Sequence, residues 1–238
     1  WIGMLISLIG TWIQTVAQSW LVFELTRSVF LLGLVGFLGS IPIFALSLFA
    51  GVVADRINKK TILLFTQNAF MILAFALAVL TQYKAITTWQ IMLIALLNGV
   101  VMAFDAPARQ AVVVELVGKN HLLNGIALNS AAFNSARMIG PALAGIFISS
   151  IGMSGCFYIN GISFLAVIIA LLAIKINGSP HRETRAEMMR ELMEGLVFIR
   201  QNRLILILLV IVGVTSLFGI SYVILMPIFA DQVLKVGV

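Results

Sequence analysis

Hydroxyl and amide side chains form a row along the first apolar segment of the chain. They recur at steps of four, three and four residues at Ser7, Thr11, Gln14 and Gln18, with Thr15 beside them. Residues at these spacings share one face of an α-helix, and in lipid such a face must meet protein or water. We interpret the row as the wall of a solute cavity, with Thr11, Gln14 and Gln18 on the solute path. Interhelical hydrogen bonds that only hold a bundle together are the alternative interpretation.

Arg137 lies near the middle of another long apolar segment, in a polar row with Ser130 and Asn134. Its side chain is too far from either end of that segment to reach the membrane surface easily. A charged group at the centre of a bilayer costs about 2.5–3.5 kcal/mol on insertion scales, so Arg137 should have a partner or face water. We predict that Asn134 and Arg137 take part in anion recognition or in coupling to a conformational change. Hydrogen bonding to helix-end carbonyls is the structural alternative.

A compact charged turn separates the second and third apolar segments. Residues 51–60 contain Gly51, Asp55, Arg56, Lys59 and Lys60. These charges would be costly in hydrocarbon, so the turn is expected at a membrane surface. Asn58 tolerates left-handed backbone angles, which makes a tight turn feasible.

Two proline motifs lie further along the chain. The run Asp105-Ala106-Pro107-Ala108-Arg109 follows the fourth apolar segment. We expect Asp105 to cap a short helix that has Pro107 in its first turn. Gly140 and Pro141 lie inside the fifth segment. There the proline removes a backbone donor and kinks the helix, and the glycine allows close helix contact or bending.

The composition is that of a membrane protein. The chain is 61% hydrophobic and 10% charged, with a mean hydropathy of +1.12, whereas soluble domains are about 45–50% apolar and about 25% charged. The net charge of +6 does not indicate a nucleic-acid partner, because the basic residues are divided among short loops. The single cysteine, Cys156, lies in an apolar segment and is expected to be a buried, inert thiol. His121 and His181 lie in loops, so we expect no catalytic residues, no cofactor and no metal site.

Seven apolar segments approach the length of about 20 residues that a helix needs to span a bilayer. They cover residues 1–25, 29–54, 61–82, 88–104, 122–149, 153–176 and 204–230. The segments are too long and unbroken for the alternating strands of a barrel, which predicts an all-α membrane protein. The stretch 178–203 mixes charged and apolar residues in a pattern that fits an amphipathic helix at the membrane interface.

The basic residues indicate the orientation of the chain. The loops 55–60, 105–121 and 177–203, with their flanking residues, carry eleven lysines and arginines, and the opposite side carries three. Positive loops lie on the cytoplasmic side. We therefore expect these three loops to be cytoplasmic, in a multi-pass protein of the inner (plasma) membrane.

The motifs resemble those of one transporter family. Residues 51–60 resemble the loop that joins the second and third helices of major facilitator superfamily transporters, except that Asn58 stands where the family has a glycine. Gly140-Pro141 resembles the fifth-helix motif of antiporters and exporters in that superfamily. The run 105–109, together with Asn129, Arg137 and residues 225–230, resembles the branch that contains the enterobactin exporter and related multidrug exporters.

This resemblance implies a helical bundle with seven of an expected twelve transmembrane helices, and therefore a fragment. Residues 1–176 would form the N-terminal six-helix bundle, 177–203 a cytoplasmic linker and 204–238 the first helix of the second bundle. The implied activity is secondary active export of small organic solutes, such as drugs or siderophores, by alternating access. The implied partners are the lipid bilayer, the solute and protons, and the full-length chain would work as a monomer.

The resemblance also implies roles for individual residues. Asp55 and Arg56 would form a charge clasp between the two bundles. The conformational switch would comprise Gly51, Asp55, Arg56, Lys59, Asp105, Arg109, Gly140 and Pro141. Asn98 and Tyr222 would join the solute path.

Proton coupling lacks an evident carrier in the sequence. Many proton-coupled drug exporters have an arginine at the fourth-helix position that Ala95 occupies here. No acidic residue is expected deep in any span, so Arg137 is the hypothetical substitute.

A seven-helix receptor and a solute channel are the alternatives. Segment 204–230 contains no lysine, which excludes a retinal protein. The non-cytoplasmic loops are only a few residues long, which disfavours a receptor, and no paired half-helix motif indicates a channel.

Overall fold

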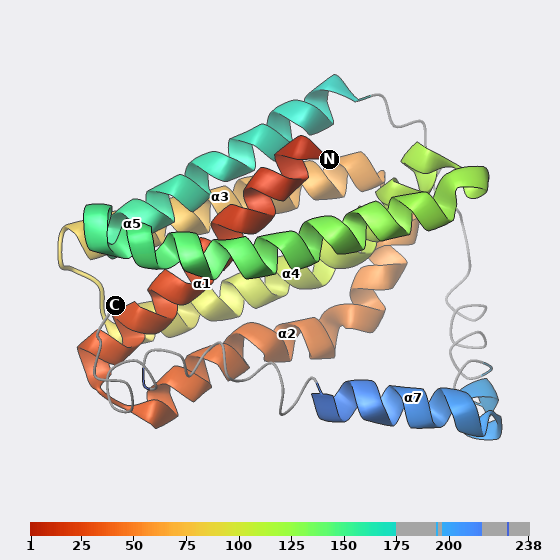
Figure 1. Ribbon diagram of the computed structural model, residues 1–238, viewed down its shortest axis with the longest axis horizontal. Helices are drawn as coiled ribbons and strands as arrows, with labels where there is room; N and C mark the ends of the chain where they lie inside the picture. Colours follow the sequence, from red (N-terminus) through yellow and green to blue (C-terminus); the bar gives the residue numbers. More distant parts are fainter. Residues whose placement is uncertain (175–193, 195–196, 216–227, 229–238) are drawn as a thin grey trace.

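A computed structural model describes residues 1–174, 194, 197–215 and 228 of the chain (Figure 1). Their regular structure is entirely helical, which confirms the all-α prediction for this part of the chain. The helices are α1 (Ile2–Thr26), α2 (Val29–Arg56), α3 (Lys59–Gln82), α4 (Thr88–Val117), the 3-10 turn η1 (Lys119–His121), α5 (Leu122–Ala173) and α7 (Arg203–Val214). Most of the predicted linker, Tyr222 and nearly all of 216–230 lie outside the described residues.

Helix α5 consists of two arms that meet at Gly152 (Figure 1). We call residues 122–151 its first arm and residues 153–173 its second arm. Gly152 has φ 75° and ψ 175°, a conformation that is accessible to glycine because it has no Cβ. The chain therefore reverses without a loop, and the two arms correspond to the predicted segments 122–149 and 153–176.

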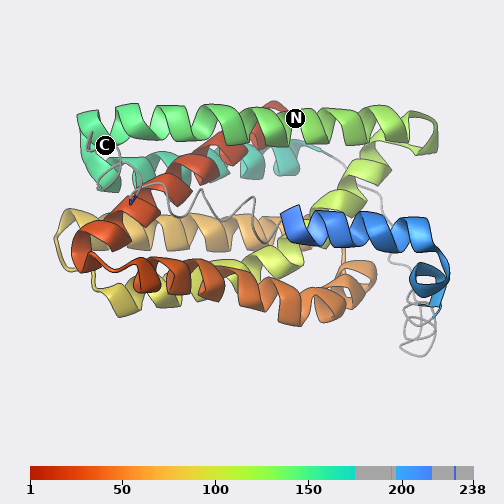
Figure 2. The same cartoon turned by 60° about the horizontal axis from the view of Figure 1, so that its bottom comes forward.

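The helices pack in preferred pairs. Helix α1 packs mainly on α5, and α2 packs on α4, while α3 contacts both α4 and α5. Helix α1 has few contacts with α2 or α4. Figure 2 shows the first arm of α5 along one side of the bundle and α2 along the opposite side, with α1 running obliquely between them. Helix α7 lies at the periphery (Figures 1 and 2). Its apolar side chains are mostly exposed.

Glycines set the closest approaches between paired helices. A Cβ added to Gly99 of α4 would lie 2.3 Å from the carbonyl oxygen of Gly39 on α2. A Cβ on Gly140 of α5 would lie 2.4 Å from the Cβ of Trp12 on α1. Membrane helices use such small residues because close packing, rather than the hydrophobic effect, drives their association.

Large apolar side chains cover the outside of the bundle. Phe44, Phe65, Met138 and Ile169 are among the exposed ones, and Phe44 is 90% exposed. Among the described residues, five helices are long and apolar enough to cross a membrane, and α5 is one of them with its two arms. An apolar exterior of this kind is suited to lipid.

The prediction that the fourth helix ends at residue 104 was wrong. Helix α4 continues unbroken through Pro107 to Val117, so Asp105 caps no helix and most of the predicted loop 105–121 is helical. The helix tolerates the loss of one backbone hydrogen bond, because Pro107 has no N–H group to donate. The carboxylate of Asp105 finds its partners on α3 and within α4 instead of at a helix end.

The predicted turn at 55–60 is also shorter than expected. Helix α2 includes Arg56 and α3 starts at Lys59, which leaves only Ile57 and Asn58 between them. Asn58 does not adopt a left-handed conformation, because its φ is −56°. It caps α3 instead, since its side chain accepts a hydrogen bond of 2.9 Å from the amide of Lys60.

Lys60 ties this turn to the end of α5. Its Nζ donates to the carbonyl oxygens of Leu172, at 3.3 Å, and Ile174, at 2.7 Å. A cation at a helix C-terminus compensates the carbonyls that lack a partner within the helix. The end of the sixth span is thereby fixed beside the start of the third.

Candidate functional site

A cavity of about 830 Å³ lies between the helix pairs. Its lining comes from α1, α2, α4 and both arms of α5, with Phe70 contributed by α3. It exists because α1 packs on α5 and α2 on α4, while the two pairs touch each other little. Phe70 and Phe164 line it with stacked rings whose centroids are 5.5 Å apart. The size and the mixed lining are typical of a small-molecule site.

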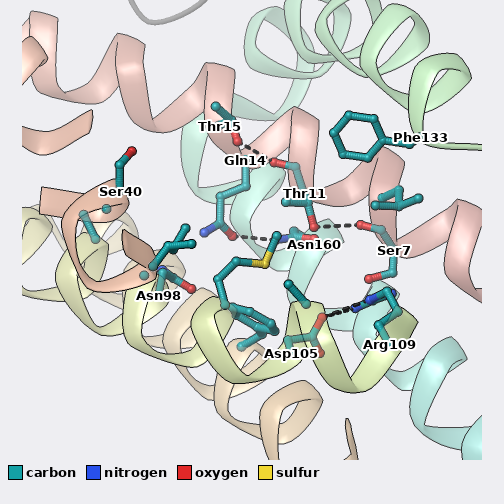
Figure 3. Close-up of a pocket in the computed structure, with 18 of the residues that line it drawn as sticks. Ser7, Thr11, Gln14, Thr15, Ser40, Asn98, Asp105, Arg109, Phe133 and Asn160 are labelled. Carbon is teal, nitrogen blue, oxygen red and sulfur yellow. Dashed lines mark hydrogen bonds and ion pairs between the residues drawn. The ribbon is translucent and has the colours of Figure 1, made fainter. Parts of the chain in front are cut away.

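The structure brings the predicted path residues together. Thr11, Gln14, Gln18 and Asn98 all line the cavity, and Figure 3 shows Thr11, Gln14 and Asn98 there. Tyr222 lies outside the described residues. Gln14 also supports the alternative interpretation, because its Oε1 accepts a 2.7 Å hydrogen bond from Nδ2 of Asn160 on α5. The α1 row thus joins two helices and faces the cavity, and its part in solute passage remains a prediction.

Three of the four α1 hydroxyl groups that line the cavity bond to their own helix. Thr11, Thr15 and Ser19 form what we call the hydroxyl ladder: each donates to the carbonyl oxygen four residues earlier, over 2.8, 2.9 and 3.0 Å. Each rung also lines the cavity. Across the cavity, Ser40 of α2 donates in the same way to Gly36, over 2.9 Å.

Asp105 is the centre of a buried polar network. Its Oδ1 accepts hydrogen bonds from Thr66 Oγ1 at 2.7 Å and Gln67 Nε2 at 2.8 Å. Its Oδ2 accepts from Nε and Nη2 of Arg109, at 2.9 and 2.6 Å (Figure 3). The Asp105 side chain is 1% exposed and that of Arg109 is 24% exposed. Both residues line the cavity.

This network places a buried acidic residue within helix α4, where a loop was predicted. Sequence reasoning missed it because it ended the fourth helix one residue before Asp105. Thr66 and Gln67 were not predicted either, although two adjacent polar residues inside the apolar segment 61–82 are a signal for buried partners. Gln67 is fully buried, and its Oε1 has no hydrogen-bond partner among the described residues. The same part of the chain contains no group of His, Cys, Asp and Glu side chains placed to hold a metal ion.

The structure separates Arg137 from the cavity. Arg137 is half-buried and does not contribute to the lining. It forms no hydrogen bond or ion pair with any other described residue, and Asn134 Nδ2 donates to the carbonyl of Ser130 over 2.8 Å. Gly140 packs against Trp12, and the helix continues through Pro141. These residues therefore lie at the α1–α5 contact and its exposed flank.

The residues of the charged turn lie at the end of α2 and the start of α3. Lys59 Nζ pairs with the carboxylate of Glu115 on α4. Arg56 is exposed, and a Cβ added to Gly51 would meet no atom within 4 Å. The ion pair links the α2–α3 turn to the extension of α4 that the sequence analysis had assigned to a loop.

Comparison with known proteins assigns the chain to a family. Residues 1–238 match the family model described as transmembrane secretion effector. The chain belongs to this family of major facilitator superfamily transporters. The superfamily is a class of transporters rather than enzymes, and the receptor and channel alternatives are not favoured.

Individual relatives in the superfamily include siderophore and drug transporters. The chain is 29% identical over 228 residues to the staphyloferrin A transporter of Staphylococcus aureus, covering 94% of this chain and 57% of the relative. It is 27% identical over 216 residues to macrolide efflux protein A of Streptococcus pyogenes, covering 89% and 53%. It is 24% identical over 198 residues to the multidrug efflux pump Tap of Mycolicibacterium fortuitum, covering 80% and 48%. The chain thus spans about half the length of these relatives.

The Lys59–Glu115 pair of this superfamily member can be tested by exchanging its charges. We expect Lys59→Glu to destabilise the full-length protein by about 1 kcal/mol, because it places two carboxylates together. Adding Glu115→Lys should restore the pair, with a coupling energy of about 0.5–1 kcal/mol. Thermal unfolding of the four purified forms measures this coupling. A loss in the double variant equal to the sum of the two single losses would show that the contact contributes nothing.

Proposed function

We propose that the full-length protein is a secondary active exporter of small organic solutes, such as siderophores or drugs. The cavity of about 830 Å³ between the helix pairs carries this proposal, because it offers a solute both hydroxyl and amide groups and apolar surface. Two relatives are named for the export of macrolides and of multiple drugs, and one for staphyloferrin A. These names support the solute class and the direction of transport.

Alternating access is the mechanism that fits this half-length chain. In such transporters two bundles rock around a site at their interface. Residues 1–176 supply one bundle, 177–203 the linker and 204–238 the first helix of the other. Asp55 and Arg56 clasp the second bundle from the cytoplasmic side, and the full-length chain works as a monomer in the plasma membrane.

Asp105 is the proton carrier that the sequence analysis did not find. Its carboxylate accepts hydrogen bonds from Arg109, Thr66 and Gln67. Arg109 supplies the countercharge of this buried carboxylate, so a conformation that separates the two would leave Asp105 without its charged partner. Acidic residues within membrane spans commonly serve as proton relays. Solute entry beside Arg109 is thereby coupled to protonation of Asp105, with Asn134 and Arg137 as the alternative coupling site.

Efflux from cells that express the full-length protein tests the proposal. Cells are loaded with a catechol siderophore or a fluorescent cationic dye, with and without a protonophore. We expect protein-dependent loss of at least one compound, and we expect the protonophore to abolish that loss. Asp55→Asn should slow efflux about tenfold, the effect of losing about 1.5 kcal/mol from a charged contact.

Matched variants separate the parts of this proposal. Glu24→Gln removes a carboxylate from the exposed end of α1, outside the switch motif, and should leave efflux unchanged. Arg137→Ala tests the alternative coupling site, and undiminished transport by this variant would eliminate it. Solute accumulation instead of loss would replace export by import, and retention equal to that of empty cells would contradict both.

A further inference from the structure

The hydroxyl ladder limits what a solute can offer to the α1 wall of the cavity. A backbone carbonyl can only accept a hydrogen bond, so the proton of each ladder hydroxyl points into its own helix. A hydroxyl has one donor and two acceptor lone pairs. Thr11, Thr15 and Ser19 therefore present only acceptors to the cavity, and Ser40 does the same from α2. The rungs are about 6 Å apart along the helix, since each is four residues from the next.

The amide groups of the cavity are less restrictive. Gln18 and Asn98 are half-buried and form no hydrogen bond with the described residues, so each can donate or accept. Gln14 has committed its Oε1 to Asn160 and retains its Nε2 donors. These amides accommodate varied polar groups, whereas the ladder discriminates between donors and acceptors.

The charged groups of the cavity do not attract an anion. Asp105 and Arg109 are the charged residues in the described lining, and their charges cancel. Nε and Nη2 of Arg109 are bonded to the carboxylate of Asp105. Nη1 of Arg109 remains as a donor, but an anion beside it would also lie near the Asp105 carboxylate and would gain no net countercharge for its lost hydration. The apolar lining, which includes Met4, Met102 and Phe133, suits the body of an amphiphile.

We infer that the cavity selects amphiphiles that carry N–H or O–H donors and no net negative charge, and that the hydroxyl ladder accepts their hydrogen bonds. This inference rests on the proposed function, because it specifies the solute class of the same cavity. A cavity of this kind distinguishes solutes that donate hydrogen bonds from solutes that only accept them. Selection by size and hydrophobicity alone would not make this distinction.

Two dyes of equal charge provide the test. Rhodamine 6G carries two N–H donors, and rhodamine B ethyl ester has the same charge and ring system but fully alkylated nitrogens. Binding of each dye to the full-length protein in nanodiscs is measured by fluorescence polarisation. We expect rhodamine 6G to bind about fivefold or more tightly, as one or two net hydrogen bonds predict. Fluorescein, an anion, should bind more weakly than either dye.

The variant Thr11→Val/Thr15→Val removes two acceptors from the ladder and keeps the branched shape of both side chains. It should lower the affinity for rhodamine 6G about fivefold and leave that for rhodamine B ethyl ester unchanged. Thr26→Val is the matched control, because Thr26 makes the same bond to the carbonyl of Val22, over 2.7 Å, outside the cavity lining. It should change neither affinity.

The possible outcomes are decisive for the inference. Any of four results would overturn it. These are equal affinities for the two rhodamines, an equal loss of affinity for both rhodamines in the double variant, tighter binding of fluorescein, and binding of no dye. Selective binding that depends on the ladder, without efflux from cells, would support the donor inference and remove the export proposal. Efflux from cells without selectivity for hydrogen-bond donors would support the export proposal and remove the donor inference.

Discussion

Replacing Asp105 with alanine is expected to destabilise the full-length protein by about 3–5 kcal/mol, the effect of breaking a buried ion pair by removing one partner. The variant would leave Arg109 without its countercharge, and Thr66 and Gln67 without their acceptor. The loss of stability is measured by thermal unfolding in detergent, with the fraction of monodisperse protein as the readout. The effect should be large because the carboxylate is 1% exposed, and because Thr66 and Gln67 are too buried for water to replace their lost acceptor.

Two companion variants show whether the unpaired charge is the cause. Asp105→Ala/Arg109→Met removes both charges and should recover most of the stability, because isolated buried charges cost more than apolar replacements. Asp105→Asn keeps the size of the side chain, so it should fold better than Asp105→Ala and lose protonophore-sensitive efflux. If Asp105→Ala unfolds at the wild-type temperature, the network is not structural. Undiminished proton-driven efflux in Asp105→Asn would remove Asp105 as the carrier.

Gly99→Ala is expected to have the second large effect. The added Cβ would lie 2.3 Å from the Gly39 carbonyl oxygen, 3.0 Å from its carbon and 3.1 Å from Cδ of Pro42. Backbone atoms cannot rotate away as a side chain can, so α2 and α4 must separate. Overpacking of this kind costs about 1–3 kcal/mol. The unfolding temperature of the purified variant measures this cost.

Gly33→Ala is the matched control on the same helix pair. A Cβ on Gly33 of α2 meets no atom within 4 Å. Replacing a helical glycine with alanine in open space should leave stability unchanged or raise it by about 0.5–1 kcal/mol. Equal unfolding temperatures for Gly99→Ala and Gly33→Ala would mean that the α2–α4 approach is looser than the structure shows.

The first three helices could be predicted almost to the residue. Their predicted ranges, 1–25, 29–54 and 61–82, differ from those of α1, α2 and α3 by at most two residues at either end. An apolar run of this length has few alternatives in a bilayer, since every backbone group must find a partner within the segment. The charged residues between α2 and α3 marked the boundary of these two helices, because charges are costly in hydrocarbon.

The fourth helix shows where prediction from sequence fails. Asp105 and Pro107 are both ordinary helix-boundary signals, and nothing local indicates that the carboxylate bonds to α3. Its partners, Thr66 and Gln67, lie 39 and 38 residues away in the chain. Hydrogen bonds between residues so far apart in the sequence form only when the bundle folds. Asp105 was therefore predicted at a surface that it does not occupy.

The candidate site was predictable in part. The spacing of Thr11, Gln14 and Gln18 identified one face of α1, and that face does line the cavity. Helical periodicity cannot identify the opposite wall, because that depends on which helices pack together. Helical periodicity could therefore predict neither the close approach of Gly99 to Gly39 nor the position of Arg137 outside the cavity lining.

The reversal at Gly152 has a consequence for the orientation of the two arms in the membrane. Both ends of α5 lie at the charged end of the bundle, where Lys60 holds the carbonyl of Ile174. At the opposite end the two arms meet directly at Gly152, so no loop between them carries a charged residue. Their orientation then depends on the flanking basic residues. The fifth and sixth spans are therefore joined as one helical hairpin, and a charge introduced beside Gly152 would lie at the end of this hairpin opposite Lys60.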